Sequence, residues 1–339
     1  MEEEKSSNRL VGLDIIKIIA CFLVLALHNG GLSAHVNFPS IMYYASVIAI
    51  PLFFMTNGYL LSGKSKKDKW YSYKKIGRIL LLTFILNVIG CIIYFLIRHT
   101  FVNPFSTMAL NLFFHDGYLW HLWFLGALAL IYLFFPALDY LYLNKQKYFI
   151  ILAGFLIFVQ CFVDIYNIYS SIKYNDIIQN HIPATFRLET NFSYFILGGI
   201  LKLFNLKLMK YANLRNVLLL YGAAVVYQFF MINKFYSVYY CEIFYDNLII
   251  ICLCTAFFLY ISNLQNIKYK KEIFILASLI MVIYIIHPLI IWGYIKFVNR
   301  IGLVYLNIYI IRLCLTYIIS VLVSWILLKI PYAKELFKI

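Results

Sequence analysis

Ten apolar runs of roughly membrane length follow one another along the chain, separated by short polar loops. A run of about 20 predominantly apolar residues is long enough to cross the hydrocarbon core of a bilayer as an α-helix. The runs cover residues 11–30, 41–62, 79–98, 118–136, 148–165, 191–206, 216–232, 244–261, 272–292 and 306–328. The pattern predicts an all-α, polytopic transmembrane helical bundle of about ten helices, in which the short runs 148–165 and 191–206 are candidates for a tilted, interfacial or re-entrant segment.

The distribution of lysine and arginine tests this arrangement, because short cytoplasmic loops of membrane proteins are rich in both residues. If the runs alternate in direction and both termini are cytoplasmic, 21 of the 29 basic residues fall on the inner side. Six fall on the outer side, and Lys17 and Arg312 lie within runs. We therefore expect both termini to be cytoplasmic. Orientation accounts for most of the net charge of +15, so no nucleic-acid partner is needed to explain it.

The composition agrees with an integral membrane protein, since 64% of the residues are hydrophobic and only 13% are charged. The first run is too long for a cleavable signal and is interrupted by Asp14 and Lys17, so we expect it to remain as the first helix. The longest outer loop, 166–190, is too short to fold as a separate domain. Residues 1–339 are expected to form a single membrane-embedded domain with no appended soluble domain.

Cysteine spacing and loop motifs give no sign of a metal or a nucleotide. The seven cysteines are scattered, with no Cys-x-x-Cys pair and no histidines at metal-binding distance along the chain. We predict no metal site and no disulfide framework, and interpret the cysteines as small buried apolar residues. No Walker loop or Gly-x-Gly-x-x-Gly sequence occurs, so nucleotide hydrolysis is not indicated.

Three ionisable residues share one face of the first run: Asp14, Lys17 and His28. At 100° per residue, His28 lies about 20° from Lys17 around the helix, and the rise of ~1.5 Å per residue places the two roughly 16 Å apart along its axis. Ionisable residues inside a transmembrane helix are costly and usually face protein or water, where they often function. Snorkelling from the helix end is the alternative, which suits Asp14 better than His28.

All seven histidines fall in the outer half of the predicted helices or in the outer loops. Two of them lie at membrane depth, His28 and His287, and His287 directly precedes Pro288. A proline frees a backbone carbonyl one turn earlier and usually kinks the helix, which would open space for a ligand beside His287. The alternative is a packing histidine that is bonded to a neighbouring carbonyl.

Basic residues are concentrated in the loop 63–78, which carries seven of them, including Lys74, Lys75 and Arg78. Topology and contact with anionic lipid could account for this charge. The other interpretation is a cytoplasmic site for a polyphosphorylated ligand, with Lys75 and Arg78 one helical turn apart.

Other polar residues at membrane depth include Asn57 and Arg312. Arg312 has no partner within its own run, and we expect Glu189 to be that partner. Arg187 and Glu189 precede the sixth run on the outer side. They either bind a polar acceptor or simply flank the membrane, and the second interpretation is favoured.

Several short sequences, taken in order, resemble the integral-membrane acyltransferase-3 family, which O-acylates cell-surface glycans. The first run, with Lys17 and His28, is similar to a signature of Arg or Lys, ten residues and His. Lys75-Ile-Gly-Arg78 resembles an Arg-x-x-Arg motif, although Lys keeps the charge and loses the bidentate fork. The other similar blocks are Pro51-Leu-Phe-Phe-Met-Thr-Asn-Gly-Tyr-Leu-Leu-Ser62, Trp120-His-Leu-Trp-Phe-Leu125, Tyr194-Phe-Ile-Leu-Gly-Gly199 and Tyr284-Ile-Ile-His-Pro288.

The resemblance implies an acyl-CoA donor, usually acetyl-CoA, bound from the cytoplasm, and a sugar hydroxyl as the acceptor on the outer side. It implies that Lys75 and Arg78, with Lys74 beside them, bind the CoA phosphates, and that Lys17 lines the channel for the pantetheine arm. His28 would act on the acyl transfer itself, either as general base for the acceptor hydroxyl or as a transient acyl carrier. The sequence does not separate these two mechanisms.

The remaining site residues have supporting roles in this interpretation. Asp14 would neutralise Lys17 or Arg78 and hold it in place, and His287 is a further catalytic candidate. The candidates for acceptor binding are Trp120, His121, Trp123, Arg187, Glu189 and Asn57. The expected partners are membrane lipid, a surface glycan or lipid-linked saccharide, and separate envelope-synthesis proteins. The expected location is a bacterial plasma membrane.

Two functions of other classes stay open. A transporter of a glycan, a lipid-linked sugar or a small solute fits polar residues and a proline near the midplane, although no inverted repeat is visible and the basic loop would have no role. A membrane scaffold for a synthase complex predicts that Lys17 and His28 are dispensable. We favour the enzyme over the transporter, and the transporter over the scaffold.

Overall fold

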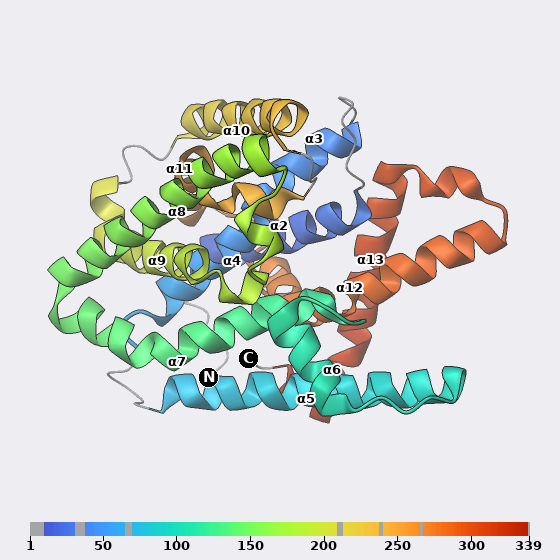
Figure 1. Cartoon of the computed structure of the whole chain (residues 1–339). Coiled ribbons are helices and arrows are strands. Elements are labelled where there is room, and N and C mark those ends of the chain that lie inside the picture. Colours follow the sequence, from blue (N-terminus) through green and yellow to red (C-terminus); the bar gives the residue numbers. More distant parts are fainter. Residues whose placement is uncertain are drawn as a thin grey trace.

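The computed structural model of the protein describes residues 10–30, 38–64, 70–208, 213–236, 240–264 and 267–337. These residues form helices joined by turns, and no β-strand occurs among them (Figure 1). Each predicted run overlaps one of ten longer helices, so the all-α polytopic fold is confirmed. These helices are α2 (Val11–Asn29), α4 (Ala49–Leu61), α5 (Tyr71–Arg98), α7 (Trp123–Asn144), α8 (Gln146–Tyr174), α9 (Leu188–Leu208), α10 (Leu214–Lys234), α11 (Leu248–Ser262), α12 (Lys270–Arg300) and α13 (Tyr309–Leu327).

Eight helical stretches of the described chain are long and apolar enough to cross a membrane. They correspond to α2, α5, α7, α8, α10, α12 and α13, together with α4 and the short helices before it, α3 (Phe38–Ala45) and η1 (Ser46–Ile48). The helix α8 has 29 residues, so the expectation that run 148–165 is of marginal length was wrong. The helix α9, which contains the short run 191–206, is not among the eight stretches, and α11 is a shorter apolar helix with 15 residues.

The first residues of two helices differ from those that the apolar pattern predicts. The helix α5 starts at Tyr71, so Lys74, Lys75 and Arg78 lie on its first turns and not in a loop. The run 244–261 is interrupted, because Cys241–Asp246 form the 3-10 helix η7 and α11 starts only at Leu248. The side chain of Asn247 between them accepts a hydrogen bond from the Ile249 backbone N–H (2.9 Å) and caps α11.

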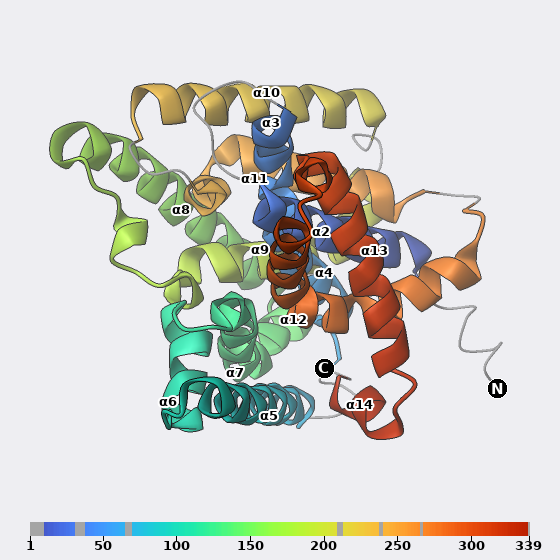
Figure 2. The same ribbon diagram turned by 90° about the vertical axis from the view of Figure 1, so that its right-hand side faces the viewer.

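The helices α2 and α4 lie in the middle of the molecule, with α10 along one edge and α5 along the opposite edge (Figures 1 and 2). The helix α2 packs against α4, α11, α12 and α13. This central place explains why α2 is apolar on nearly every side, and why Asp14 is buried while Lys17 and His28 line cavities inside the bundle.

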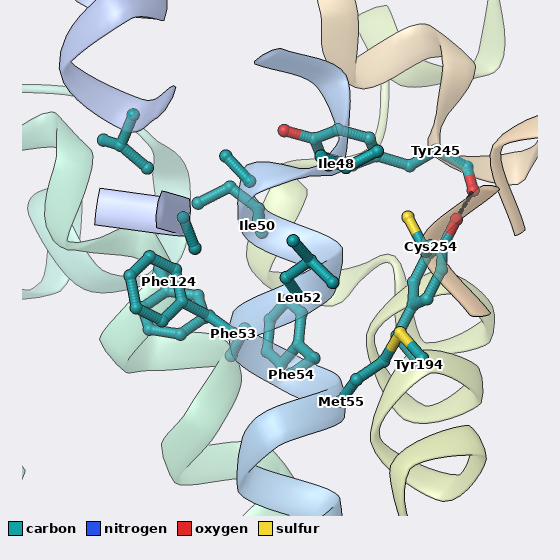
Figure 3. Packing of buried hydrophobic residues seen from close by; sticks show 14 of the residues in the cluster. Ile48, Ile50, Leu52, Phe53, Phe54, Met55, Phe124, Tyr194, Tyr245 and Cys254 are labelled. Carbon is teal, nitrogen blue, oxygen red and sulfur yellow. Dashed lines mark hydrogen bonds between the residues drawn. The ribbon is translucent and has the colours of Figure 1, made fainter. Parts of the chain in front are cut away.

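The closest helix contact joins α4 to α9 and depends on glycine. A Cβ atom added to Gly58 would lie 1.8 Å from the carbonyl oxygen of Phe195, and one added to Gly198 would lie 1.9 Å from that of Met55. Small residues allow two helix backbones to approach in this way. As a result α4 is held between α9 on one side, near Met55, and α7 on the other, where Phe53 meets Phe124 (Figure 3).

Arg312 does not pair with Glu189, as the sequence led us to expect. Its guanidinium Nη2 donates instead to the backbone carbonyl of Asn29, at the end of α2. Asn29 also donates from its side chain to the Thr316 hydroxyl (3.1 Å). These bonds attach the outer end of α2 to α13.

Candidate active site

A cavity of about 410 Å³ lies at the C-terminal end of α2, where α2 and α12 meet η7 and the segment that leads into α7. We call it the outer cavity, because the distribution of lysine and arginine predicts that this end of α2 is extracytoplasmic. His28, in the last turn of α2, lines this cavity. The cavity is lined by Val24, Leu27, His28, Tyr43, Ile50, His115, Trp120, His121, Trp123, Gln179, Arg187, Tyr240, Cys241, Glu242, Tyr245 and Tyr284. Mostly apolar walls with a few convergent polar groups are typical of a small-molecule site.

Three histidines from different helices meet beside this outer cavity. The ring centroid of His28 lies 5.1 Å from that of His287 and 5.0 Å from that of Trp120. The rings of His121 and His287 are 5.6 Å apart. His287 is fully buried behind His28 and does not itself line the cavity.

Pro288 determines the hydrogen bonding of His287. In a regular helix the Tyr284 carbonyl would accept from the backbone N–H of residue 288, which proline lacks. The Nδ1 of His287 takes this place and donates to the Tyr284 carbonyl at 2.7 Å. A carbonyl can only accept, so Nδ1 carries the proton and Nε2 is left with a buried lone pair that has no partner among the described residues. The packing interpretation of His287 is therefore supported, because the residue is bonded to a neighbouring carbonyl, lies against the His28 ring and lines neither this cavity nor the one beside Lys17.

His121 is fixed in the same way, by the other ring nitrogen. Its Nε2 donates to the Ile285 carbonyl at 3.1 Å, and its Nδ1 has no partner among the described residues. Two neutral imidazoles thus present unused lone pairs next to the cavity. Such buried acceptors are uncommon in folded proteins and often mark functional sites.

An ion pair lies across the outer cavity from these histidines. Arg187 Nη1 is 3.5 Å from Glu242 Oε2, and both side chains are largely buried. His115 lines the cavity as well. Burial is the largest influence on the His115 pKa and lowers it. The charge of Glu242 raises this pKa and the charge of Arg187 lowers it, both to smaller extents, so we expect a neutral His115 at pH 7.

A second cavity, of about 270 Å³, lies towards the inner end of α2. Lys17 lines it, and its ammonium group is 2.8 Å from the buried carboxylate of Asp14. Asn57 of α4 lines it too, and accepts a hydrogen bond from the Tyr132 hydroxyl (3.3 Å). Phe337 lines this inner cavity too, so the end of α14 (Pro331–Leu336) lies on the same side of the bundle as Lys17.

Tyr284 lines both cavities, so its ring belongs to the wall between them. On α4, Ile50 faces the outer cavity and Phe53 faces the inner one, one helical turn apart. The ring centroid of Phe124 lies 5.7 Å from that of Phe53, which Figure 3 shows beside it, and 5.7 Å from that of Tyr284. The Tyr284 hydroxyl donates to the backbone carbonyl of His121 and holds the ring in this wall.

The basic residues predicted for the cytoplasmic side lie at the start of α5, which packs along α7. The ammonium groups of Lys64 and Lys75 lie 5.3 and 5.6 Å from the ring centroid of Tyr71. Lys74 and Arg78 are on the same first turns of the helix. Three other lysines of this region, Lys66, Lys67 and Lys69, are outside the described residues.

The structure brings together most, but not all, of the predicted residues. The outer cavity collects His28, Trp120, His121, Trp123 and Arg187. Lys17 and Asn57 lie in the inner cavity, so Asn57 is separated from the tryptophan group to which we assigned it. Glu189 lines neither of these cavities.

Sequence reasoning missed Glu242 and Tyr284, and gave His115 no role. The signal for His115 was present, because every histidine was expected on the outer side. Glu242 belongs to η7, which the apolar pattern treated as the edge of a helix. No group of three His, Cys, Asp or Glu residues in the described chain could hold a metal ion.

The described residues thus form a polytopic helical membrane bundle with two cavities, one beside the histidine cluster and one beside Lys17. A family model described as an acyltransferase domain matches residues 10–329, which is nearly the whole chain. The chain therefore belongs to the acyltransferase-3 family. No curated protein and no solved structure matched it.

Proposed function

We propose that this membrane acyltransferase moves an acyl group, most simply acetyl, from cytoplasmic acyl-CoA to a hydroxyl of an extracytoplasmic or lipid-linked glycan. Family membership supports acyl transfer over transport or a scaffold role. The assignment of a donor side and an acceptor side rests on one observation: two cavities share Tyr284, and Lys17 lines one of them while the histidines line the other. An anionic donor and a hydroxyl acceptor need opposite environments of this kind.

The donor side of the proposal rests on the basic residues. Lys75 and Arg78, with Lys74, bind the phosphates of CoA at the start of α5, where cations are concentrated. Lys17 borders the path of the pantetheine arm in the inner cavity. Asp14, 2.8 Å away, keeps this ammonium group in place and balances its charge.

The reaction itself is assigned to His28. The acceptor oxygen attacks the thioester carbonyl carbon, the bond from that carbon to sulfur breaks, and the hydroxyl proton passes through the His28 imidazole to the departing thiolate. In the second mechanism His28 first takes the acyl group from sulfur and then gives it to the hydroxyl. In both, the free Nε2 lone pair of His287 lies near the His28 ring and can accept a hydrogen bond from its N–H, while the proton itself ends on the thiolate.

The acceptor side is the outer cavity, with Trp120, His121, Trp123 and Arg187. Aromatic faces next to polar side chains suit a sugar ring with its apolar faces and its hydroxyl edge. Glu189 and Asn57 lie away from this group, and we do not assign them to the acceptor. The proposed setting is a bacterial plasma membrane, with separate envelope-synthesis proteins as partners.

The test uses inside-out membrane vesicles that receive acetyl-CoA labelled in the acetyl group. We expect the intact protein to transfer label to a glycan or lipid fraction and His28→Ala to lose it. His181→Ala is the matched control, because His181 is an exposed outer histidine that is paired with Asp176 and does not line the cavity. No consumption of acetyl-CoA by the intact protein, or full transfer by His28→Ala, would contradict the proposal.

A further inference from the structure

The outer cavity contains a charged pair that the transfer chemistry does not use. The guanidinium of Arg187 is fixed by two backbone carbonyls: Nε donates to Ile182 (3.2 Å) and Nη2 donates to Gln179 (3.1 Å). Only Nη1 is directed at Glu242, whose carboxylate lies 3.5 Å away. The exposed fractions of the two side chains are 7% and 16%, so both charges are held largely away from bulk water.

The Glu242 carboxylate has unused acceptor capacity. Its contact with Arg187 is much longer than the roughly 2.8 Å of a strong charge-assisted hydrogen bond. No other hydrogen bond to its oxygens is made by the described residues, although a carboxylate offers about four acceptor positions. A largely buried anion with so few donors is costly unless the molecule that fills the cavity supplies them.

The residues around Glu242 indicate which kind of ligand would donate hydrogen bonds to its carboxylate. Trp120, Trp123 and Tyr240 present aromatic rings to the same cavity. Aromatic faces cover the C–H surfaces of a sugar ring, while its hydroxyls need acceptors at the edge. Glu242 provides such an acceptor, and the rigid Arg187 provides a donor beside it.

The charge balance of the cavity points to an uncharged sugar. Among the described residues that line the cavity, Arg187 is the only lysine or arginine, and Glu242 already balances its charge. A uronate carboxylate placed here would meet the Glu242 carboxylate without a further cation, in surroundings of low dielectric constant. The imidazoles give no compensation while they are neutral.

We infer that Glu242 selects the acceptor: its carboxylate accepts hydrogen bonds from the hydroxyls of an uncharged sugar residue that lies between the Arg187–Glu242 pair and the aromatic wall, and it rejects acidic sugars. This inference rests on the proposed function, since it names the acceptor class of the same site. Glu242 is a specificity residue in this account, and His28 remains the reacting group.

The test uses the purified full chain in detergent with labelled acetyl-CoA and two matched pairs of acceptors, methyl glucoside with methyl glucuronide and methyl galactoside with methyl galacturonide. We expect the intact protein to use the neutral member of a pair at least tenfold better. Glu242→Gln should raise the KM for the neutral acceptor about tenfold to a hundredfold and reduce the discrimination by a similar factor, because a charged hydrogen-bond partner is lost. Asp176→Asn is the control, as it removes an outer carboxylate that lies away from the cavity.

Equal or better use of the uronides by the intact protein would overturn the inference, and this comparison needs no variant. An unchanged KM and unchanged discrimination in Glu242→Gln would also overturn it, while transfer by the intact protein would leave the proposed function standing. If the intact protein releases no CoA from acetyl-CoA with any acceptor, the proposed function fails and the inference falls with it.

Discussion

The contact between α4 and α9 leads to a stability prediction that a single methyl group can test. Gly198→Ala adds a Cβ atom 1.9 Å from the backbone carbonyl oxygen of Met55, whereas ordinary contact begins at 3.4 Å. The obstacle is backbone and not the end of a flexible side chain, so the two helices have to move apart by roughly 1.5 Å. Gly58→Ala produces the reciprocal clash with the Phe195 carbonyl.

The size of the effect follows from this geometry. Overpacking of a core costs about 1–3 kcal/mol, and a clash between two helix backbones belongs at the upper end, so we expect Gly198→Ala to lose about 3 kcal/mol of unfolding free energy. The same separation would relieve both clashes. The double variant Gly58→Ala and Gly198→Ala should therefore lose clearly less than the sum of the two single losses.

The assay is thermal unfolding of the purified protein in detergent, followed by tryptophan fluorescence. A loss of this size corresponds to a melting temperature lower by roughly 5 °C. Gly154→Ala is the matched control, because Gly154 lies in the middle of α8 and an added Cβ atom there meets nothing within 4 Å. The control should keep its melting temperature or gain slightly, since alanine favours the helix by about 1 kcal/mol. Equal melting temperatures for Gly198→Ala and Gly154→Ala, or additive losses in the double variant, would refute the reasoning.

Two further predictions concern the proline of α12 and a buried carboxyl next to the site. Pro288→Ala restores a backbone N–H that competes with His287 for the Tyr284 carbonyl. We therefore expect acetyl transfer to be at least tenfold slower while the melting temperature is unchanged. Unchanged transfer would contradict this prediction. Asp246 lies in η7, outside the membrane-spanning helices, and burial raises its pKa from 3.8 to about 7. Because the folded state then binds more protons than the unfolded state, stability is lost as the pH rises from about 4 to 7. Asp246→Asn should remove this dependence, which amounts to roughly 2 kcal/mol between pH 5 and pH 7. Melting temperatures at pH 5, 6 and 7 measure it, and parallel profiles of the two proteins would contradict the prediction.

Local periodicity was enough to predict the helices and the shared face of Lys17 and His28 on α2. Apolar length identified each span, and the rotation between residues along α2 predicted one face for Lys17 and His28. In the structure Lys17 lines the inner cavity and His28 lines the outer cavity, on the two sides of the wall that contains Tyr284. Their positions follow from helix geometry within one run, which sequence determines without knowledge of the tertiary contacts.

The errors concern pairings between distant parts of the chain. Arg187 and Glu242 are 55 residues apart and meet through η7, a break that an apolar pattern does not distinguish from a continuing helix. Arg312 was given a carboxylate as partner because charge was the only available criterion. It took the backbone carbonyl of Asn29, which lies at a helix end where carbonyls have no partner in the helix.

The wall around Tyr284 bears on what has to cross the membrane under the proposed function. Its rings, those of Phe53, Phe124 and Tyr284, offer no charge to the phosphates of CoA, which belong with the cations at the start of α5. Carrying a charged group through such a wall costs at least about 3 kcal/mol per charge, whereas an acetyl group is neutral and small. A donor that stays on its own side and extends only its acyl end therefore avoids this cost. The hydrogen bond from Tyr284 to the His121 carbonyl then has a second consequence, because any movement of the wall that admits the acyl group also moves the backbone of the histidine cluster that receives it.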